Sequence, residues 1–320
     1  MTTTMPYSLA VVVPAYNETE VLERFHGRLA AVFATMDVEA SVIYVDDGSA
    51  DDTWAIITRL AASDSRVAGL RLSRNFGKEA ALTAGLDAAD ADAVVVIDAD
   101  LQDPPELIPQ LVARLREGND VVYATRDDRA GETRFKKFTS AGFYRLMERL
   151  SDNPMPRDTG DFRVLSRRAV AALRGLRERQ RFMKGLFAWI GYRQVAFRYH
   201  RDARAAGATK WNYWRLTNLA IEGITSFSAA PLRMATWLGL STAALAFLYG
   251  IWVILKVLVW GDPVRGYPTL LVVILFLGGA QLMALGVIGE YVGRTYSETK
   301  RRPLYYVEDS RGPVSPFTPP

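Results

Sequence analysis

The chain has 320 residues, a formal net charge of +4 at pH 7 and no cysteine. That length suits one large α/β domain with a smaller appendage, or two modest domains. The lack of cysteine excludes disulfides and cysteine-ligated metals, and it fits a reducing compartment. No nucleic-acid-binding signature accompanies the modest charge, so we expect no nucleic acid partner. Basic residues that flank the apolar segments instead suit an anionic membrane surface.

The N-terminus has no basic segment, and its first apolar run of about six residues is too short for a signal peptide. After it, apolar β-type runs alternate with amphipathic stretches. We expect strands at residues 9–13, 40–45, 67–72, 93–97 and 120–124. We expect helices at residues 18–36, 51–62, 77–89 and 104–117. This order favours a mostly parallel sheet covered by helices, which binds ligands at the carboxyl ends of its strands.

Polar residues cluster where the first, second and fourth of these strands end. The segments are Pro14-Ala-Tyr16-Asn-Glu18, Asp46-Asp47-Gly48-Ser49 and Asp98-Ala-Asp100-Leu-Gln102-Asp103. An Asp-x-Asp pair alone is common in surface turns, but Asp98 and Asp100 follow a run of β-forming residues. With Gln102 they offer oxygen ligands for Mg²⁺ or Mn²⁺ and leave positions for diphosphate oxygens. A carboxylate of the Asp46-Asp47 pair can accept an N–H of uracil or guanine.

The C-terminal third is strongly apolar. Residues 234–260 and 268–291 are each long enough to span a bilayer, and the short connection between them predicts a hairpin. Basic residues flank its two ends, at Arg233 before it and at Arg294 and 300–302 after it. By the positive-inside rule both ends lie in the cytosol. The alternative is a buried helical hairpin in a soluble domain.

These patterns divide the chain into four parts. They are a cytosolic domain (1–210), an amphipathic juxtamembrane segment (211–232), a transmembrane hairpin (233–293) and a cytosolic C-terminal tail (294–320). Aromatic and aliphatic residues of the second part can lie in the membrane interface. We therefore predict a multi-pass protein of the cytoplasmic (inner) membrane whose large domain faces the cytosol. Its membrane segments would allow side-by-side assembly into a homo-oligomer.

Six segments, in order, resemble the family 2 glycosyltransferases of the polyprenyl-phosphate type, which include dolichyl-phosphate mannosyltransferases and bactoprenol glucosyltransferases. The segments are residues 13–18 (VPAYNE), 45–51 (VDDGSAD), 75–78 (NFGK), 98–106 (DADLQDPPE), 158–163 (DTGDFR) and 181–191 (RFMKGLFAWIG). The resemblance covers nearly the whole chain, including the hairpin. It implies a nucleotide-sugar domain of the GT-A type, with a mostly parallel sheet.

The resemblance also implies roles for the matching residues. Binding of the nucleoside diphosphate sugar would fall to Pro14, Tyr16, Glu18, Asp47, Asp98, Asp100, Arg204 and Lys210. The metal, Mg²⁺ or Mn²⁺, would be held by Asp98, Asp100 and Gln102. In the basic segment at 204–211, Trp211 replaces the usual tyrosine and keeps an aromatic ring.

The acceptor follows from a separate argument. A lipid monophosphate is already largely ionised near neutral pH, so it needs cationic guidance more than a strong base. The candidates for binding it are Arg126, Arg134, Lys137 and Arg163, although the loop residues also fit a solvated charge run. Asp161 is our first candidate for the carboxylate nearest the reacting centre, and Asp158 is the second.

The predicted reaction is the inverting transfer of a hexose to a polyprenyl (undecaprenyl or dolichyl) phosphate at the cytosolic membrane face. Glucose from UDP-glucose is favoured on resemblance alone, and mannose, galactose or a modified arabinose stay open. One alternative is a processive polysaccharide synthase, whose Gln-x-x-Arg-Trp motif the sequence lacks. Another is a non-catalytic membrane module that binds nucleotide, against which the intact Asp98, Asp100 and Gln102 set argues.

Overall fold

The computed structural model describes residues 7–126, 159–179, 181–199, 230–260 and 266–313. The chain separates into two compact units. The sheet unit comprises Met1–Tyr144, Asn153–Lys210 and Arg302–Pro320, and the hairpin unit comprises Arg145–Asp152 and Trp211–Arg301. The predicted site residues Arg134, Lys137, Asp158, Arg204 and Lys210, together with Trp211, lie outside the described residues.

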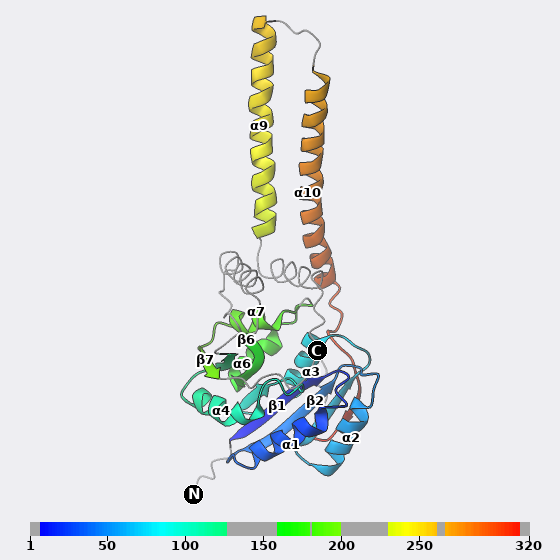
Figure 1. Cartoon of the computed structure of the whole chain (residues 1–320), viewed down its shortest axis with the longest axis vertical. Coiled ribbons are helices and arrows are strands. Elements are labelled where there is room, and N and C mark those ends of the chain that lie inside the picture. Colours follow the sequence, from blue (N-terminus) through cyan, green and yellow to red (C-terminus); the bar gives the residue numbers. More distant parts are fainter. Residues whose placement is uncertain (1–6, 127–158, 180, 200–229, 261–265, 314–320) are drawn as a thin grey trace. The chain divides into compact units, whose positions relative to one another are not determined.

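The described part of the sheet unit is built on one sheet with the strand order β7-β5-β6-β4-β1-β2-β3-β8 (Figure 1). The strands are β1 (Ser8–Ala15), β2 (Glu39–Asp46), β3 (Val67–Leu72), β4 (Ala93–Val96), β5 (Val121–Arg126), β6 (Thr159–Ser166), β7 (Gln194–Tyr199) and β8 (Val307–Arg311). β4, β1, β2 and β3 run parallel, as do β5 and β7. β6 is antiparallel to β4 and β5, and β8 is antiparallel to β3. The mostly parallel α/β sheet expected from the sequence is confirmed.

Helices connect these strands and cover the sheet (Figure 1). They are α1 (Leu22–Phe33), α2 (Thr53–Ser63), α3 (Lys78–Ala88), the 3-10 helix η1 (Pro105–Leu107), α4 (Ile108–Arg116), α6 (Arg167–Gly175) and α7 (Met183–Trp189). The first helix begins four residues later than position 18, where the sequence placed it. Glu18 belongs to a turn, and its backbone N–H donates to Thr53 Oγ1 at 2.9 Å. The helix therefore begins after this turn.

The core lies between the sheet and these helices. β1 is buried along nearly its whole length, and α1 packs Leu22, Phe25 and Leu29 against the sheet. Removing one such side chain from water contributes about 1.5–3 kcal/mol, so this layer fixes where the strand ends stand. The helix α3 lies close against the sheet at Gly85, where an added Cβ would lie 2.2 Å from Val12 Cγ1.

The hairpin unit contains α9 (Ala230–Trp260) and α10 (Tyr267–Thr299), which pack against each other. Both helices are long and apolar enough to cross a membrane. Their large side chains are exposed, with Trp237 at 70%, Leu258 at 77% and Leu282 at 71%. Apolar surface of this extent is unfavourable in water but favourable in lipid. The exposure argues against the alternative of a buried hairpin in a soluble domain.

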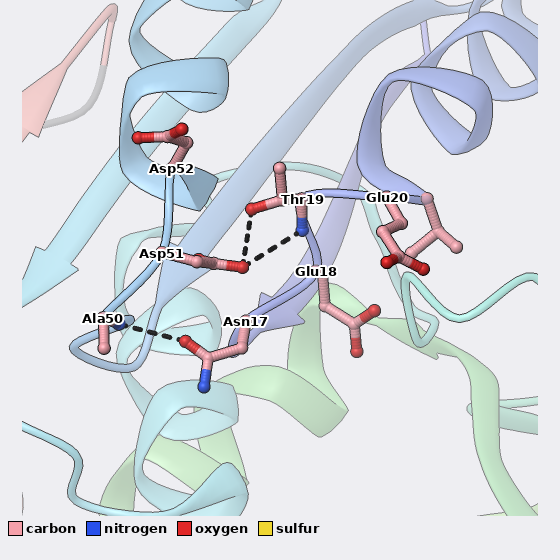
Figure 2. Close-up of a pocket in the computed structure, with 8 residues that line it drawn as sticks. Asn17, Glu18, Thr19, Glu20, Ala50, Asp51 and Asp52 are labelled. Atoms are coloured by element: carbon pink, nitrogen blue, oxygen red, sulfur yellow. Dashed lines mark hydrogen bonds between the residues drawn. The ribbon is translucent and has the colours of Figure 1, made fainter.

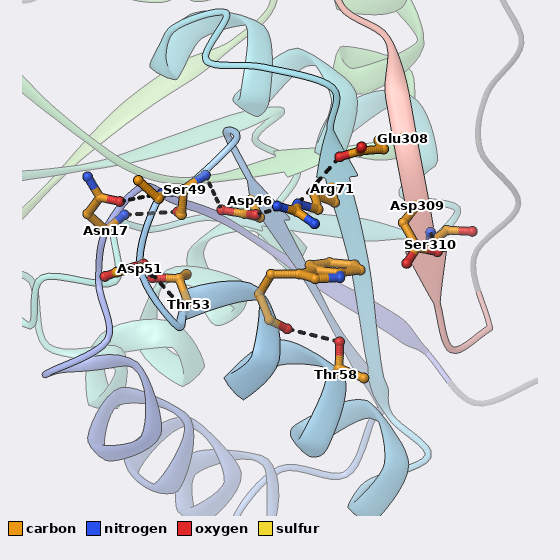
Figure 3. A network of polar contacts seen from close by, with 12 residues as sticks. Asn17, Asp46, Ser49, Asp51, Thr53, Thr58, Arg71, Glu308, Asp309 and Ser310 are labelled. Atoms are coloured by element: carbon orange, nitrogen blue, oxygen red, sulfur yellow. Dashed lines mark hydrogen bonds and ion pairs between the residues drawn. The ribbon is translucent and has the colours of Figure 1, made fainter.

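The C-terminal tail contributes a strand that was not expected from the sequence. β8 is polar, yet it pairs with β3 in the register Gly69↔Arg311 to Leu72↔Val307. Arg71 of β3 lies 3.5 Å from Glu308 of β8 (Figure 3). The segments that precede and follow the hairpin in sequence therefore belong to one sheet.

We predict that Gly85→Ala lowers the stability of the protein by on the order of 1–3 kcal/mol, because the methyl group would overpack the contact between α3 and β1. Gly27→Ala in α1 is the matched control, since a Cβ at Gly27 meets nothing within 4 Å. Alanine there should leave the unfolding temperature unchanged or raise it. Thermal unfolding of both variants tests the contact, and equal unfolding temperatures would contradict it.

Candidate active site

Three charged side chains from three different elements meet where β4 ends. The Lys78 ammonium, at the start of α3, lies 2.7 Å from the Asp98 carboxylate and 2.5 Å from the Asp161 carboxylate. The antiparallel register pairs Val96 of β4 with Arg163 of β6. Continued by two residues, that register brings Asp161 beside Asp98. The side chains are partly accessible, at 43% for Lys78, 28% for Asp98 and 22% for Asp161, so a substrate can reach them.

The electrostatics of this cluster favour the charged forms of Lys78 and Asp161, but not that of Asp98. Burial alone would lower the pKa of Lys78, but the carboxylates of Asp161 and Asp98 outweigh it and raise the pKa. Burial works to raise the pKa of Asp161, and the Lys78 and Lys184 ammonium groups more than offset it, so the pKa lies below its usual value. Burial outweighs Lys78 at Asp98, whose pKa is raised. Asp161 is therefore an ionised hydrogen-bond acceptor at neutral pH and not a proton donor.

Negative charge exceeds positive charge on the donor side of the cluster. Burial, with further contributions from Asp100, Asp98 and Asp51, raises the pKa of Glu18 to about 7. Asp100 Oδ1 accepts the backbone N–H of Gln102 at 2.9 Å across a tight turn. The oxygen atoms of Asp98, Asp100 and Gln102 are the kind that Mg²⁺ and Mn²⁺ prefer, and a divalent cation would relieve the repulsion. The residues therefore fit such an ion.

A divalent cation at this site would need ligands besides the acidic side chains. Within the described ranges, no group of three or more histidine or acidic side chains is placed to hold an ion by itself. An ion at Asp98 and Asp100 would need the Gln102 amide oxygen and oxygens from the diphosphate. A site of this kind is complete only when the substrate is bound.

A shallow depression of about 600 Å³ lies at the ends of β1 and β2 (Figure 2). It is lined by residues 17–21 and 50–52. Glu18, which lines it, is close enough to Asp98 and Asp100 for their charges to raise its pKa. Asp51 fixes the shape of the depression, because one carboxylate oxygen accepts from Thr19 Oγ1 at 2.5 Å and the other from Thr53 Oγ1 at 2.5 Å. The Asn17 side-chain oxygen also accepts the N–H of Ala50 at 3.0 Å. Hydrogen bonds thus hold the two loops in one arrangement.

The predicted donor-binding residues differ in accessibility. Tyr16 is 46% exposed, and Glu18 is half-buried and lines the depression. Pro14 is buried within β1, and Asp47 is 3% exposed. Tyr16 and Glu18 can therefore touch a nucleotide directly, whereas Pro14 can act only through the backbone.

Asp47 makes contacts that the sequence did not reveal. Its two carboxylate oxygens accept the backbone N–H groups of Phe76 at 2.7 Å and Gly77 at 2.9 Å. Gly77 has a φ of 97°, which favours glycine, and Lys78 follows it. Asp47 thus anchors the loop that delivers Lys78, and its predicted contact with the base stays a prediction.

The neighbouring Asp46 is fully buried. Its carboxylate accepts the N–H of Ser49 at 3.1 Å and lies 3.6 Å from the Arg71 guanidinium (Figure 3). Because none of its side chain is exposed, Asp46 shapes the end of β2 and has no access to a ligand.

The predicted acceptor-binding residues are described only in part. Arg163 is 3% exposed, donates to the carbonyls of Gly160 at 2.9 Å and Asp161 at 3.3 Å, and lies over the Phe187 ring. Burial lowers its pKa to about 10. These contacts fix the backbone of Asp161, and a contact of Arg163 with phosphate stays a prediction. Arg126 is the last residue of β5, in register with Tyr199.

Lys78 and Glu79 were missed as functional candidates, although Lys78 ends one of the segments that carry the resemblance. Burial, with a contribution from Asp161, raises the pKa of Glu79 to about 7. Glu79 also accepts the N–H of Met183 at 3.3 Å, which links α3 to α7. For Lys78 the signal in the sequence was the resemblance segment at 75–78, and for Glu79 it was an adjacent Lys-Glu pair where a helix was expected to begin.

Comparisons with known proteins identify the family of the chain. Residues 10–174 match the family "Glycosyl transferase family 2", and residues 230–295 match the "GtrB C-terminal hairpin". The bactoprenol glucosyl transferase of Shigella phage SfV is 47% identical over 303 residues, which cover 95% of this chain and 99% of the relative. An uncharacterized glycosyltransferase of Synechocystis, sll0501, is 50% identical over 308 residues, covering 96% and 97% respectively. The chain belongs to glycosyl transferase family 2.

We predict a pH-dependent stability that originates at Glu79. The folded protein holds the Glu79 proton more tightly than the unfolded chain, because burial raises the pKa from 4.5 to about 7. The stabilising contribution is complete below pH 4.5 and is lost as the pH rises through about 7. Between pH 5 and 8, wild type should lose on the order of 1–3 kcal/mol relative to Glu79→Gln, whose amide does not ionise.

Thermal unfolding across this pH range measures the difference between the two proteins. Glu117→Gln is the control, because the Glu117 side chain is 55% exposed and its described ion pair is with Arg114. This variant should follow wild type at every pH. Parallel curves for wild type and Glu79→Gln would show that Glu79 is not the source.

Proposed function

We propose that this glycosyltransferase transfers glucose from UDP-glucose to the phosphate of a polyprenyl lipid, with inversion at the anomeric carbon. The observation that carries the proposal is the partly accessible Lys78, Asp98 and Asp161 cluster beside an acidic depression at the strand ends. The name of the 47% identical phage relative, a bactoprenol glucosyl transferase, supports glucose and a polyprenyl acceptor. Nothing in the described site favours a processive synthase or a non-catalytic module.

The donor would occupy the depression and the acidic edge next to it. Tyr16 presents an exposed ring on which a base can stack, and Glu18 is placed to accept from a ribose hydroxyl. The diphosphate would lie towards Asp98 and Asp100. A bound Mg²⁺ or Mn²⁺ would neutralise the charge that develops on the departing diphosphate.

The sugar and the acceptor would meet at Asp161. Its ionised carboxylate, held by Lys78, can accept hydrogen bonds from sugar hydroxyls and orient the ring. A phosphate oxygen of the lipid would form the new bond to the anomeric carbon while the bond to the diphosphate oxygen breaks on the opposite side. The lipid phosphate is already ionised, so no side chain has to remove a proton in this step.

The sheet supports the proposed membrane topology. β7 precedes the hairpin in sequence, β8 follows it, and both strands belong to the same sheet. A chain that leaves and rejoins one sheet must cross a membrane an even number of times, which two spanning helices satisfy. With basic residues at 294 and 300–302, the sheet unit would face the cytosol of the cytoplasmic (inner) membrane. Assembly into a homo-oligomer stays a prediction.

The reaction can be tested with the purified full-length protein in lipid nanodiscs containing undecaprenyl phosphate and Mg²⁺. We expect UDP-glucose to yield a lipid product that is heavier by one hexose in mass spectrometry. Asp100→Ala should lower its formation by about 100-fold or more, because a carboxylate facing the diphosphate is lost.

Asp90→Ala is the matched control, since the Asp90 side chain is 84% exposed and pairs with Arg167. It should retain wild-type activity and unfolding temperature. Asp100→Ala should stay folded, with a small drop in unfolding temperature because the Gln102 N–H loses its acceptor. If no nucleotide sugar yields a lipid product, the proposed function is wrong. If Asp100→Ala stays active, the metal assignment is wrong.

A further inference from the structure

The C-terminal tail contacts both ends of the element that carries Lys78. After α10 ends at Thr299, residues 300–304 lead to Tyr305 and Tyr306, directly before β8. Lys78 is the first residue of α3, and Asp87 lies in its last turn. Tyr305 reaches Asp87, and Tyr306 reaches the loop that precedes Lys78.

The contact of Tyr305 is a buried hydrogen bond. Its hydroxyl donates to Asp87 Oδ2 at 2.8 Å, and the two side chains belong to residues that are 9% and 5% exposed. Arg177 donates to the same carboxylate at 2.7 and 2.9 Å. A carboxylate that accepts these bonds in a buried setting is confined to one position. The end of α3 is therefore tied to the tail and to the segment after α6.

The contact of Tyr306 lies at the other end of α3. Its carbonyl accepts the backbone N–H of Ser73 at 2.9 Å, which extends the pairing of β8 with β3. Its ring lies 6.4 Å from the Phe76 ring, centroid to centroid, while the Arg74 guanidinium lies 4.0 Å from the same ring. Asp47 holds the backbone of Phe76 from the interior. The loop is thus held between Asp47 inside and the tail outside.

The packing of α3 on the sheet does not by itself fix the position of Lys78. Residues 80–87 are buried, and Gly85 fits against Val12, which fixes the distance of the helix from the sheet. Lys78 itself lies before this buried stretch, and its side chain is 43% exposed. Its position depends on the loop at 73–77, where the described side-chain contacts from outside the loop come from Asp47 and Tyr306.

We propose that Tyr305 and Tyr306 are positioning residues, which hold α3 and its leading loop so that the Lys78 ammonium lies between Asp98 and Asp161. The tail that follows the hairpin thereby takes part in forming the active site. A role in turnover rests on the proposed function, whereas a role in ordering the loop does not.

The test uses the full-length protein in nanodiscs and the variants Tyr305→Phe and Tyr306→Ala. Asp309→Asn is the matched control, because Asp309 lies in β8 and its described side-chain contacts are with Ser310 and Arg311. We expect each tyrosine variant to lower kcat by about tenfold while KM for the donor changes by less than about twofold. Amide hydrogen exchange should become faster in residues 73–82 and stay unchanged in α1. The control should match wild type in both measurements.

Combining Tyr306→Ala with Lys78→Arg adds a second criterion. If the tail acts through Lys78, the tyrosine change should cost much less than tenfold in the Lys78→Arg protein, because both changes disturb the same contact. Effects of the two changes that multiply independently would overturn the proposal. A lower kcat in the tyrosine variants without faster hydrogen exchange at residues 73–82 would also overturn it. If wild type forms no lipid product, the proposed function fails, and hydrogen exchange alone then decides the role of the tail.

Discussion

The candidate active site depends on the two contacts that the Lys78 ammonium group makes with carboxylates. Asp98 follows a parallel strand, Asp161 lies in an antiparallel strand, and their carboxylates both lie within 2.7 Å of Lys78 Nζ. Two carboxylates this close would repel each other without a cation between them, and each would raise the pKa of the other. Lys78 therefore stabilises two ionised carboxylates side by side, one after β4 and one in β6.

Several residues of the sheet unit hold the Lys78 ammonium group in place. Gly77 permits the sharp entry into α3, and Asp47 fixes the loop by accepting two backbone N–H groups. Arg163 holds the backbone of Asp161 from the opposite side. In our account the tail supplies the remaining restraint through Tyr305 and Tyr306. Side chains whose described contacts are internal thus position the groups of the candidate site.

The fold could be predicted from the sequence where the pattern is local. The runs at 9–13, 40–45, 67–72, 93–97 and 120–124 are strands, because buried strands carry continuous apolar residues. β6 was not expected, since Thr-Gly-Asp-Phe-Arg has the composition of a loop, and only its neighbours β4 and β5 make it a strand. β8 has no apolar run, so nothing in its own residues predicts the pairing with β3. Such edge strands depend on partners far away in sequence.

The candidate site could also be predicted only in part from the sequence. Strand position brought Asp98 to attention, and the resemblance brought Asp161. Neither revealed the lysine between them, which is 20 and 83 residues away. Motifs also do not separate residues that bind ligands from residues that bind backbone. Asp47 and Arg163 have the right chemistry for a base and a phosphate, yet their described hydrogen bonds are internal. That distinction requires coordinates. The most direct test of the account is the single-turnover rate of lipid product formation in nanodiscs by Lys78→Met, with the affinity for UDP measured in parallel. The account predicts a loss of about 100-fold or more in rate, with UDP affinity within about threefold of wild type, because the ammonium organises the reacting groups and not the base. A Lys78→Met protein that keeps the wild-type rate would contradict it.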